Sequence, residues 1–150
     1  MLRVNDEAQL ETNKLNIEDI SSKLTEETRG PYQNVFLQEC EYMNKLIAEI
    51  TKSLFEIELA FKGELTMSDK MEQLMDSIYL NRVPLSWSKL AFPSTRGLGS
   101  WLDNIKQRLE QLNQWKEEPS RIPTVTFLNR LMNPQSFLTA IKQVYARANV

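Results

Sequence analysis

The sequence predicts an all-α fold, a helical bundle of about five to seven helices that includes two long ones. Apolar residues recur three and four positions apart through most of the chain, and only four glycines and six prolines separate these stretches. With 150 residues, 41% of them hydrophobic and 25% charged, the chain has the length and composition of one globular domain. It is therefore expected to bury a hydrophobic core without disulfides or metals.

Residues 1–30 form a weakly patterned lead-in. The first sixteen are rich in Asn, Asp, Glu and Gln, which favours a frayed start. Ile17, Ile20 and Leu24 then follow a candidate helix cap at Asn16. We expect a short helix there that ends before Gly30.

The strongest helical signal comes next. Eight apolar residues are spaced three or four positions apart, which places them on one face of a long helix: Phe36, Cys40, Met43, Ile47, Ile50, Leu54, Ile57 and Phe61. The helix is predicted to end at Lys62, because Gly63 suits the left-handed residue that follows many helices. Each buried residue of this kind stabilises a fold by roughly 1.5 to 3 kcal/mol before entropy is subtracted. The stripe therefore needs a partner surface.

A shorter helix is predicted after residues 64–67. Either Ser68 or Asp69 is expected to cap it, with Glu72 three residues after Asp69 in a capping-box arrangement. The helix is expected to end near Asn81, before Pro84. Its apolar face consists of Met71, Leu74, Met75 and Ile78.

A brief helix and a second long one are predicted to follow. Pro84 suits the first turn of a helix through Trp87 and Leu90, which Pro93 would close. The second long stripe extends from about Thr95 to Glu117 and contains Leu98, Trp101, Leu102, Ile105, Leu109, Leu112 and Trp115. We expect the two long helices to pair.

The last part of the chain is predicted to be a loop, a short helix and a final helix. Pro119 and Pro123 mark the loop, and a short helix is expected through Val125, Phe127, Leu128 and Leu131, with an extended conformation as the alternative. Asn133 and Pro134 are a strong helix start. The buried side of the final helix consists of Phe137, Leu138, Ile141, Val144 and Tyr145. Because no glycine or proline stop follows it before Val150, we expect the parent protein to continue.

No catalytic, cofactor or metal site is predicted. The absence of histidine excludes Ser-His and Cys-His nucleophile pairs and zinc sites that contain histidine. Cys40 falls inside the first stripe, so it is interpreted as a small core residue, and a single cysteine fits a reducing compartment. No phosphate-binding glycine motif is present, and Gly97 and Gly99 are interpreted as a tight turn that lets Trp101 approach a neighbour.

The acidic residues have an ordinary structural interpretation. Asp69, Glu72 and Asp76 share one helix face, where carboxylates favour the positive end of the helix dipole more readily than they hold a cation. Glu39 and Glu41 are expected to point to different faces, so they do not form an acid and base pair.

Charge does not predict a nucleic-acid or membrane partner. The formal net charge is −2, and neither a signal peptide nor a long apolar run is present. Four basic residues lie near the tryptophans of the second stripe: Lys106, Arg108, Lys116 and Arg121. Acidic residues interleave with them: Asp103, Glu110, Glu117 and Glu118. This mixture favours a solvated helix face.

Six sequence blocks occur in an order that is typical of one family. They are PYQNVFLQECEYMNKL (31–46), KGELTMS (62–68), VPLSW (83–87), AFPS (91–94), GLGSW (97–101) and NPQSFLTAI (133–141). In this order the sequence resembles the C-terminal region of dynein heavy chains, most closely the axonemal type. The resemblance covers about residues 31–148 and divides the sequence into a lead-in, 1–30, and the helical part of that region, 31–150.

The resemblance implies a structural role. In the family this region follows the sixth AAA module and lies as helices across one face of the motor ring, while ATP is hydrolysed in other modules. The implied partners are the AAA ring modules and the dynein complex, with microtubules reached only through the parent protein, and no cofactor is implied. The implied location is the cytoplasm and cytoskeleton, in the axoneme of a cilium or flagellum.

The sequence departs from the family pattern in three places. Asn129, Arg130, Leu131 and Met132 stand where the family usually has a glycine and aromatic residues. The first thirty residues match poorly, and the β-rich portion that follows in axonemal members is missing. We predict a non-catalytic segment that braces the motor ring; the alternative is a free-standing helical adaptor or coiled-coil dimer that uses the stripe from Phe36 to Phe61.

Overall fold

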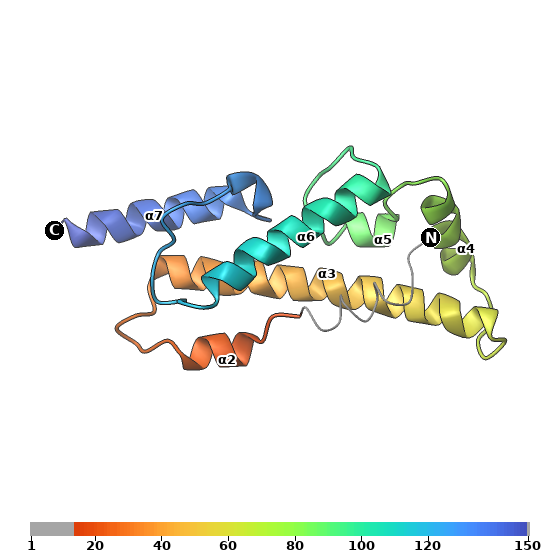
Figure 1. Cartoon of the computed structure of the whole chain (residues 1–150), viewed down its shortest axis with the longest axis horizontal. Helices are drawn as coiled ribbons and strands as arrows, with labels where there is room; N and C mark the ends of the chain where they lie inside the picture. The colour runs from red at the N-terminus through yellow and green to blue at the C-terminus, as the bar shows by residue number, and fades with distance from the viewer. Residues whose placement is uncertain (1–13, 150) are drawn as a thin grey trace. The chain divides into compact units, whose positions relative to one another are not determined.

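The computed structural model describes residues 14–149, and all regular elements in that range are helical (Figure 1). They are α2 (Ile17–Ser22), α3 (Pro31–Phe61), α4 (Asp69–Tyr79), α5 (Leu85–Ser88), α6 (Leu98–Trp115), the 3-10 helix η1 (Leu128–Arg130) and α7 (Pro134–Ala148). The predicted all-α fold with two long helices is thus confirmed. The predicted frayed start, up to residue 13, and the predicted continuation past Val150 fall outside the described residues.

The molecule divides into two compact units. Among the described residues, one unit contains Asn44–Asn104, and the other combines Leu15–Met43 with the residues from Ile105 onward. The helices α3 and α6 each contribute one part to each unit. Within residues 14–149, no helix combines the length and the apolarity that crossing a membrane requires.

In the unit formed by residues 44–104, α3 ends through a left-handed glycine. Gly63 has a φ of 78°, and the N–H of Glu64 donates to the carbonyl of Leu59 at 3.0 Å. This bond, with one from Gly63 to Ala60 at 3.1 Å, satisfies carbonyls that the helix end would otherwise leave free. The helix ends at Phe61, one residue before the predicted end, and Lys62 pairs with Glu58 at 2.7 Å.

The cap of α4 is Ser68, the first of the two residues predicted for this role. Its hydroxyl accepts the N–H of Met71 at 3.3 Å. Asp69 is already the first helical residue, so the predicted capping box between Asp69 and Glu72 is wrong. The physical reason is that Ser68 has the extended backbone that a cap requires, with φ −93° and ψ 164°.

A left-handed asparagine joins the end of α4 to the start of α6. Asn81 has a φ of 54°, its carbonyl accepts the N–H of Leu98 at 3.0 Å, and its Oδ1 accepts the N–H of Gly99 at 3.2 Å. A Cβ at Gly97 would lie 2.8 Å from Asn81 Nδ2. The glycine at this turn therefore makes room for Asn81.

Two tryptophans form the centre of this unit. Trp87 of α5 and Trp101 of α6 are almost fully buried, and their rings stack with centroids 6.2 Å apart. The indole N–H of Trp87 donates to Ser53 Oγ at 3.3 Å, which connects α5 to α3. The short helix begins after Pro84 rather than at it, and α6 begins at Leu98, later than predicted.

Four aromatic rings form the centre of the other unit. Tyr32 and Phe36 of α3 contact Trp115 of α6 with ring centroids 5.9 and 6.0 Å apart. Phe137 of α7 stacks on Trp115 at 5.7 Å. The N-terminal part of α3, the C-terminal part of α6, and α7 thus share one core. α7 begins as predicted, with Asn133 Oδ1 accepting the N–H of Ser136.

The left-handed Asn81 gives a stability prediction. Asn81→Ala is expected to lower the free energy of unfolding by about 1 to 2 kcal/mol, because alanine tolerates positive φ poorly and leaves the Gly99 N–H without its acceptor. Asn81→Gly keeps the backbone conformation accessible and should lose about half as much. Urea denaturation followed by tryptophan fluorescence measures both variants. Equal losses for the two would show that the backbone conformation contributes nothing.

Candidate functional site

The most distinctive site is a backbone segment held by buried polar side chains. It comprises residues 116–133, which connect α6 to α7, and is named the clamped segment. Within residues 14–149, no three His, Cys, Asp or Glu side chains gather as a metal site would require.

Glu39 of α3 holds the C-terminal end of the clamped segment. The residue is only 2% exposed, and its two carboxylate oxygens accept the N–H groups of Met132 at 2.7 Å and Asn133 at 2.8 Å. Burial raises the pKa of Glu39, while these two donors and the charge of Arg108 oppose the rise. Sequence reasoning considered Glu39 only as half of an acid and base pair and missed this role. Its position three residues after Phe36 and four before Met43, inside the apolar stripe, is the signal that could have identified it.

Arg108 of α6 binds the same stretch of backbone. Its Nη1 donates to the carbonyl of Leu131 at 2.7 Å and its Nη2 to that of Asn129 at 2.8 Å. The residue is 4% exposed, so its predicted place on a solvated helix face is wrong. The reason is that the clamped segment covers this part of α6, whereas Lys106 and Arg121 are exposed as predicted.

Gln111 of α6 binds the middle of the clamped segment. Its Oε1 accepts the N–H of Phe127 at 2.8 Å, and its Nε2 donates to the carbonyl of the same residue at 3.3 Å. One buried carboxamide thus satisfies both backbone groups of Phe127, as a neighbouring β-strand would. Gln33 of α3 holds the N-terminal end, donating to the carbonyls of Pro119 at 3.3 Å and Ser120 at 3.1 Å.

These bonds explain why the predicted short helix through Val125 and Leu131 is wrong in extent. Only Leu128–Arg130 forms a helical turn, and Phe127 has an extended backbone with φ −92° and ψ 102°. The side chains of Gln111 and Arg108 occupy backbone groups that a longer helix would use internally. The extended alternative therefore describes Phe127, and residues 125–127 lie outside any helical turn.

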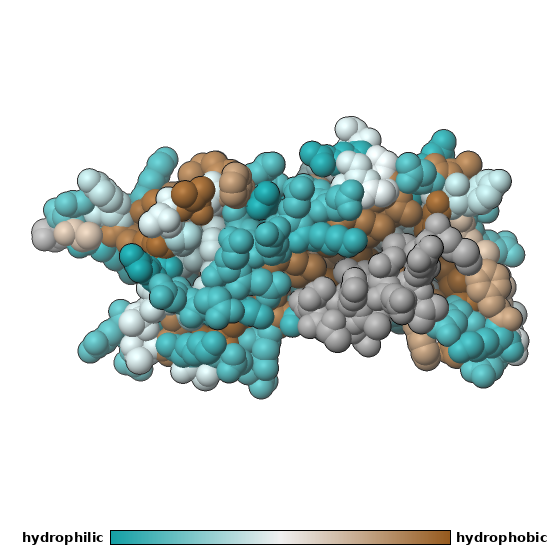
Figure 2. Space-filling view, in the orientation of Figure 1, coloured by the Kyte–Doolittle hydropathy of each residue, from teal (hydrophilic) through white to brown (hydrophobic). Residues whose placement is uncertain are grey.

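The outer side of the clamped segment is apolar. Val125 is 67% exposed and Phe127 is 50% exposed, while Ile122 and Leu128 are exposed to a lesser degree. The guanidinium of Arg130 lies 4.3 Å from the centre of the Phe127 ring. Figure 2 shows brown, apolar side chains gathered over η1 and the adjoining part of α7. This is the kind of surface that proteins use to bind one another.

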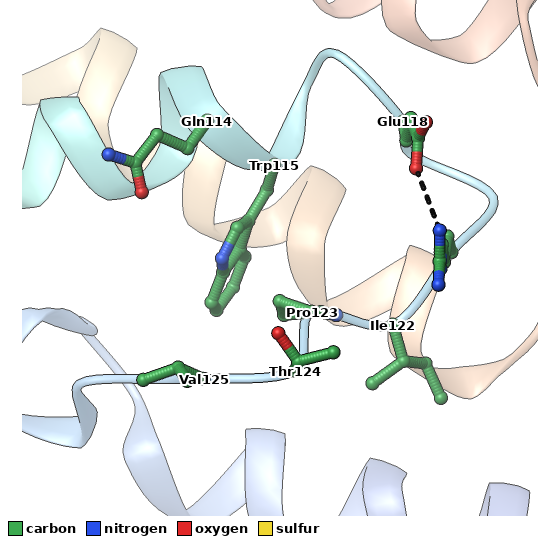
Figure 3. Close-up of a pocket in the computed structure, with 8 residues that line it drawn as sticks. Gln114, Trp115, Glu118, Ile122, Pro123, Thr124 and Val125 are labelled. Carbon is green, nitrogen blue, oxygen red and sulfur yellow. Dashed lines mark ion pairs between the residues drawn. The ribbon is translucent and has the colours of Figure 1, made fainter.

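A hollow of about 440 Å³ lies beneath the segment. Trp115 points into it from α6, and Pro123, Thr124 and Val125 face the indole from the clamped segment (Figure 3). An ion pair between Glu118 and Arg121, at 3.7 Å, closes its rim. Because both side chains are exposed, this pair contributes little free energy to the fold.

The structure places most residues of the two predicted stripes inside the molecule. The buried members are Phe36, Cys40, Met43, Ile47, Ile50, Leu54, Ile57, Leu98, Trp101, Ile105, Leu109, Leu112 and Trp115. Leu102 is half-buried, and Phe61 is 64% exposed because it is the last helical residue of α3. The buried members pack the protein itself and offer no surface to a partner.

Cys40 and Tyr32 are buried polar groups of the core. Burial, with the charges of Glu39 and Glu41, raises the pKa of the Cys40 thiol to about 12, so it stays protonated at neutral pH. The Tyr32 hydroxyl is buried, and within residues 14–149 it has no hydrogen-bond partner. Burial raises its pKa as well.

Comparison with known proteins relates the sequence to one family. The family described as the C-terminal domain of the dynein heavy chain matches residues 2–150. The "Dynein beta chain, ciliary" of Heliocidaris crassispina is 45% identical over 136 residues, which cover 91% of this protein and 3% of the relative. The "Dynein beta chain, flagellar outer arm" of Chlamydomonas reinhardtii is 46% identical over 134 residues, covering 89% of this protein and 3% of the relative.

A human protein shows the same relation. "Dynein axonemal heavy chain 9" is 44% identical over 138 residues, covering 92% of this protein and 3% of the relative. The 150 residues therefore span about 3% of the length of these relatives. The resemblance predicted from six sequence blocks is confirmed.

The contacts of Glu39 predict a large effect of a small change. In Glu39→Gln, a carboxamide has one acceptor oxygen, so one of the two N–H groups at Met132 and Asn133 loses its partner. The free energy of unfolding should fall by about 1 to 3 kcal/mol. Glu41→Gln, at an exposed position of the same helix, is the matched control and should change it by less than about 0.5 kcal/mol. Urea denaturation at neutral pH measures both, and equal effects would contradict the assigned role.

The raised pKa of Glu39 also predicts the sign of a pH dependence. As the pH rises, the unfolded state releases the Glu39 proton near the ordinary pKa of 4.5, whereas the folded state releases it at a higher pH. The contribution of Glu39 to the free energy of unfolding is therefore fully present below pH 4.5 and is lost as the pH rises through the pKa of the folded state. The stability advantage of the natural protein over Glu39→Gln should therefore shrink as the pH rises above about 4.5 toward the folded pKa of Glu39. Urea denaturation at a series of pH values measures this advantage, and an advantage that grows as the pH rises would contradict a raised pKa.

The raised pKa of Cys40 predicts an unreactive thiol. At about pH 8 the native protein should react with a disulfide reagent at least about a hundredfold more slowly than the protein in concentrated guanidinium chloride, since only the thiolate attacks. Absorbance of the released thiol gives both rates. Similar rates under the two conditions would show that Cys40 is accessible and ionised in the folded protein.

Proposed function

Since this protein belongs to the family formed by the C-terminal domain of dynein heavy chains, we propose that it is a non-catalytic structural segment of an axonemal-type dynein heavy chain. It braces neighbouring modules of the AAA motor ring and so supports the ATP-driven movement of the parent along microtubules. The sequence has neither a P-loop motif nor a histidine, and in this proposal ATP is hydrolysed elsewhere in the parent. Residues 31–150 form the bracing part, and residues 1–30 lead into it.

The proposal places the protein in a dynein complex of the cytoskeleton. The relatives carry the descriptions "ciliary", "flagellar outer arm" and "axonemal", which support the axoneme of a cilium or flagellum as its location. The remainder of the parent motor supplies the partners that the bracing requires. Microtubules are reached through the parent protein alone.

The observation that carries the proposal is the exposed apolar side of the clamped segment. Val125, Phe127 and Leu128 face outward from a backbone that is bonded to buried side chains of α3 and α6. A surface held in this way loses little conformational entropy when a partner binds, so a given buried area yields a higher affinity. The two apolar stripes maintain the scaffold behind it.

A modest docking surface is sufficient for bracing within one polypeptide. Two parts of the same polypeptide meet at an effective concentration that reaches the millimolar range for short connections. A few exposed apolar side chains can therefore hold a covalently connected module, although they would bind a separate protein weakly. The apolar side of the clamped segment is small, so it suits docking to a module of the same polypeptide better than binding to a separate protein.

The alternative, a free-standing adaptor or coiled-coil dimer, has less support. Its seam would be the stripe on α3, and all of that stripe except Phe61 is buried in the molecule. A dimer through this seam would have to expose the core first. Light scattering is expected to give a monomer at all concentrations tested, and a concentration-dependent dimer would favour the adaptor.

The docking proposal predicts a selective loss of binding. The double variant Val125→Asp and Leu128→Asp should reduce co-purification of this protein with the remainder of an axonemal heavy chain at least about tenfold, because charged side chains resist burial. Leu85→Asp, at a position 68% exposed in the unit of residues 44–104, is the control and should bind normally.

Circular dichroism should show the same helicity for all three proteins, because every altered position is exposed. Unchanged co-purification of the double variant would contradict docking through the clamped segment. ATP turnover by the isolated protein would contradict its non-catalytic role.

A further inference from the structure

A second hollow lies between the N-terminal part of α3, residues 31–38, and residues 133–143 at the start of α7, all within one unit. Its volume is about 460 Å³. The floor is apolar and consists of Pro31, Val35 and Ala140. None of the side chains that line it is charged, and most carry an amide or a hydroxyl group. The hollow is therefore built for an uncharged ligand that both donates and accepts hydrogen bonds.

The polar side chains form two walls with a regular spacing. Asn34 and Gln38 lie four residues apart on α3, and Gln135, Thr139 and Gln143 lie four residues apart on α7. Four residues of an α-helix advance about 6 Å along its axis. Two residues of an extended peptide advance about 6.6 Å, and they present their N–H and C=O groups to the same side. The walls thus nearly match the repeat of an extended peptide backbone.

These side chains are available for binding. All five are exposed, and none forms a hydrogen bond with another residue of the described range, 14–149. Asn133, at the end of the groove, is different because its amide oxygen caps α7. Side-chain amides offer a donor and an acceptor together, which is what a peptide group requires from its neighbour.

We propose that this groove binds an extended, uncharged peptide segment through its backbone, with one edge of the peptide against each wall. Small side chains of the peptide would lie on the floor formed by Val35 and Ala140. The absence of charge along the walls is unfavourable for nucleic acids and for highly charged peptides, which need compensating ions. This inference does not depend on the bracing proposal, since the groove is lined by other residues than the clamped segment's apolar side.

The test uses the complete protein and two arrays of capped decapeptides. One array contains only uncharged residues, and the other carries two glutamates in each peptide. Peptides of the uncharged array should shift the side-chain amide NMR signals of Gln38, Gln135 and Gln143, and the charged array should not. N-methylation of alternate backbone amides in the strongest binder should weaken binding about tenfold or more, because it removes donors without altering side chains.

Matched variants locate the site. The double variant Thr139→Ala and Gln143→Ala should weaken binding about tenfold, whereas Gln107→Ala, an exposed amide on α6 outside the groove, should leave it unchanged. Circular dichroism checks that all variants fold. The proposal is overturned if no uncharged peptide shifts these signals at millimolar concentration, or if N-methylation has no effect. It is also overturned if a neutral oligosaccharide such as maltoheptaose binds there and the peptides do not.

Discussion

Glu39 and Arg108 bind one short stretch of backbone, residues 129–133, from two different helices. The Glu39 carboxyl group accepts two N–H groups and the Arg108 guanidinium donates to two carbonyls, so both buried side chains are satisfied by backbone dipoles. Removing either partner would leave the other groups unpaired inside the fold. The path of the backbone between α6 and α7, and the start of α7 itself, depend on these contacts.

The same contacts decide which apolar residues remain on the surface. Since Gln111 and Arg108 engage the backbone of Phe127, Asn129 and Leu131, the segment cannot wind into a longer helix with an apolar face turned inward. Val125 and Phe127 stay exposed as a result. An apolar surface on a backbone that is already ordered is the physical basis of the proposed docking role. The uncharged groove between α3 and α7 is a separate consequence of the same packing, since both helices begin beside it.

The two long helices were predictable because their apolar residues repeat at the helical period, and this pattern depends only on sequence neighbours. The same holds for Asn133 and Pro134 at the start of α7 and for Gly63 after α3. Arg108 was placed wrongly because its burial depends on a segment more than twenty residues away in sequence, at Asn129 and Leu131. Glu39 was missed for the same reason, since its partners lie more than ninety residues away.

By itself, then, the sequence determined the all-α class, the two long helices, the absence of histidine chemistry and the resemblance to dynein heavy chains. These conclusions rest on local periodicity, on composition and on the order in which six sequence blocks occur along the chain. Only the tertiary structure decided which polar side chains are buried, that Phe127 is extended, and where exposed apolar and uncharged polar surfaces lie. The reason is that a buried charge must find its hydrogen-bond partners in space, and those partners come from parts of the sequence that no local pattern connects.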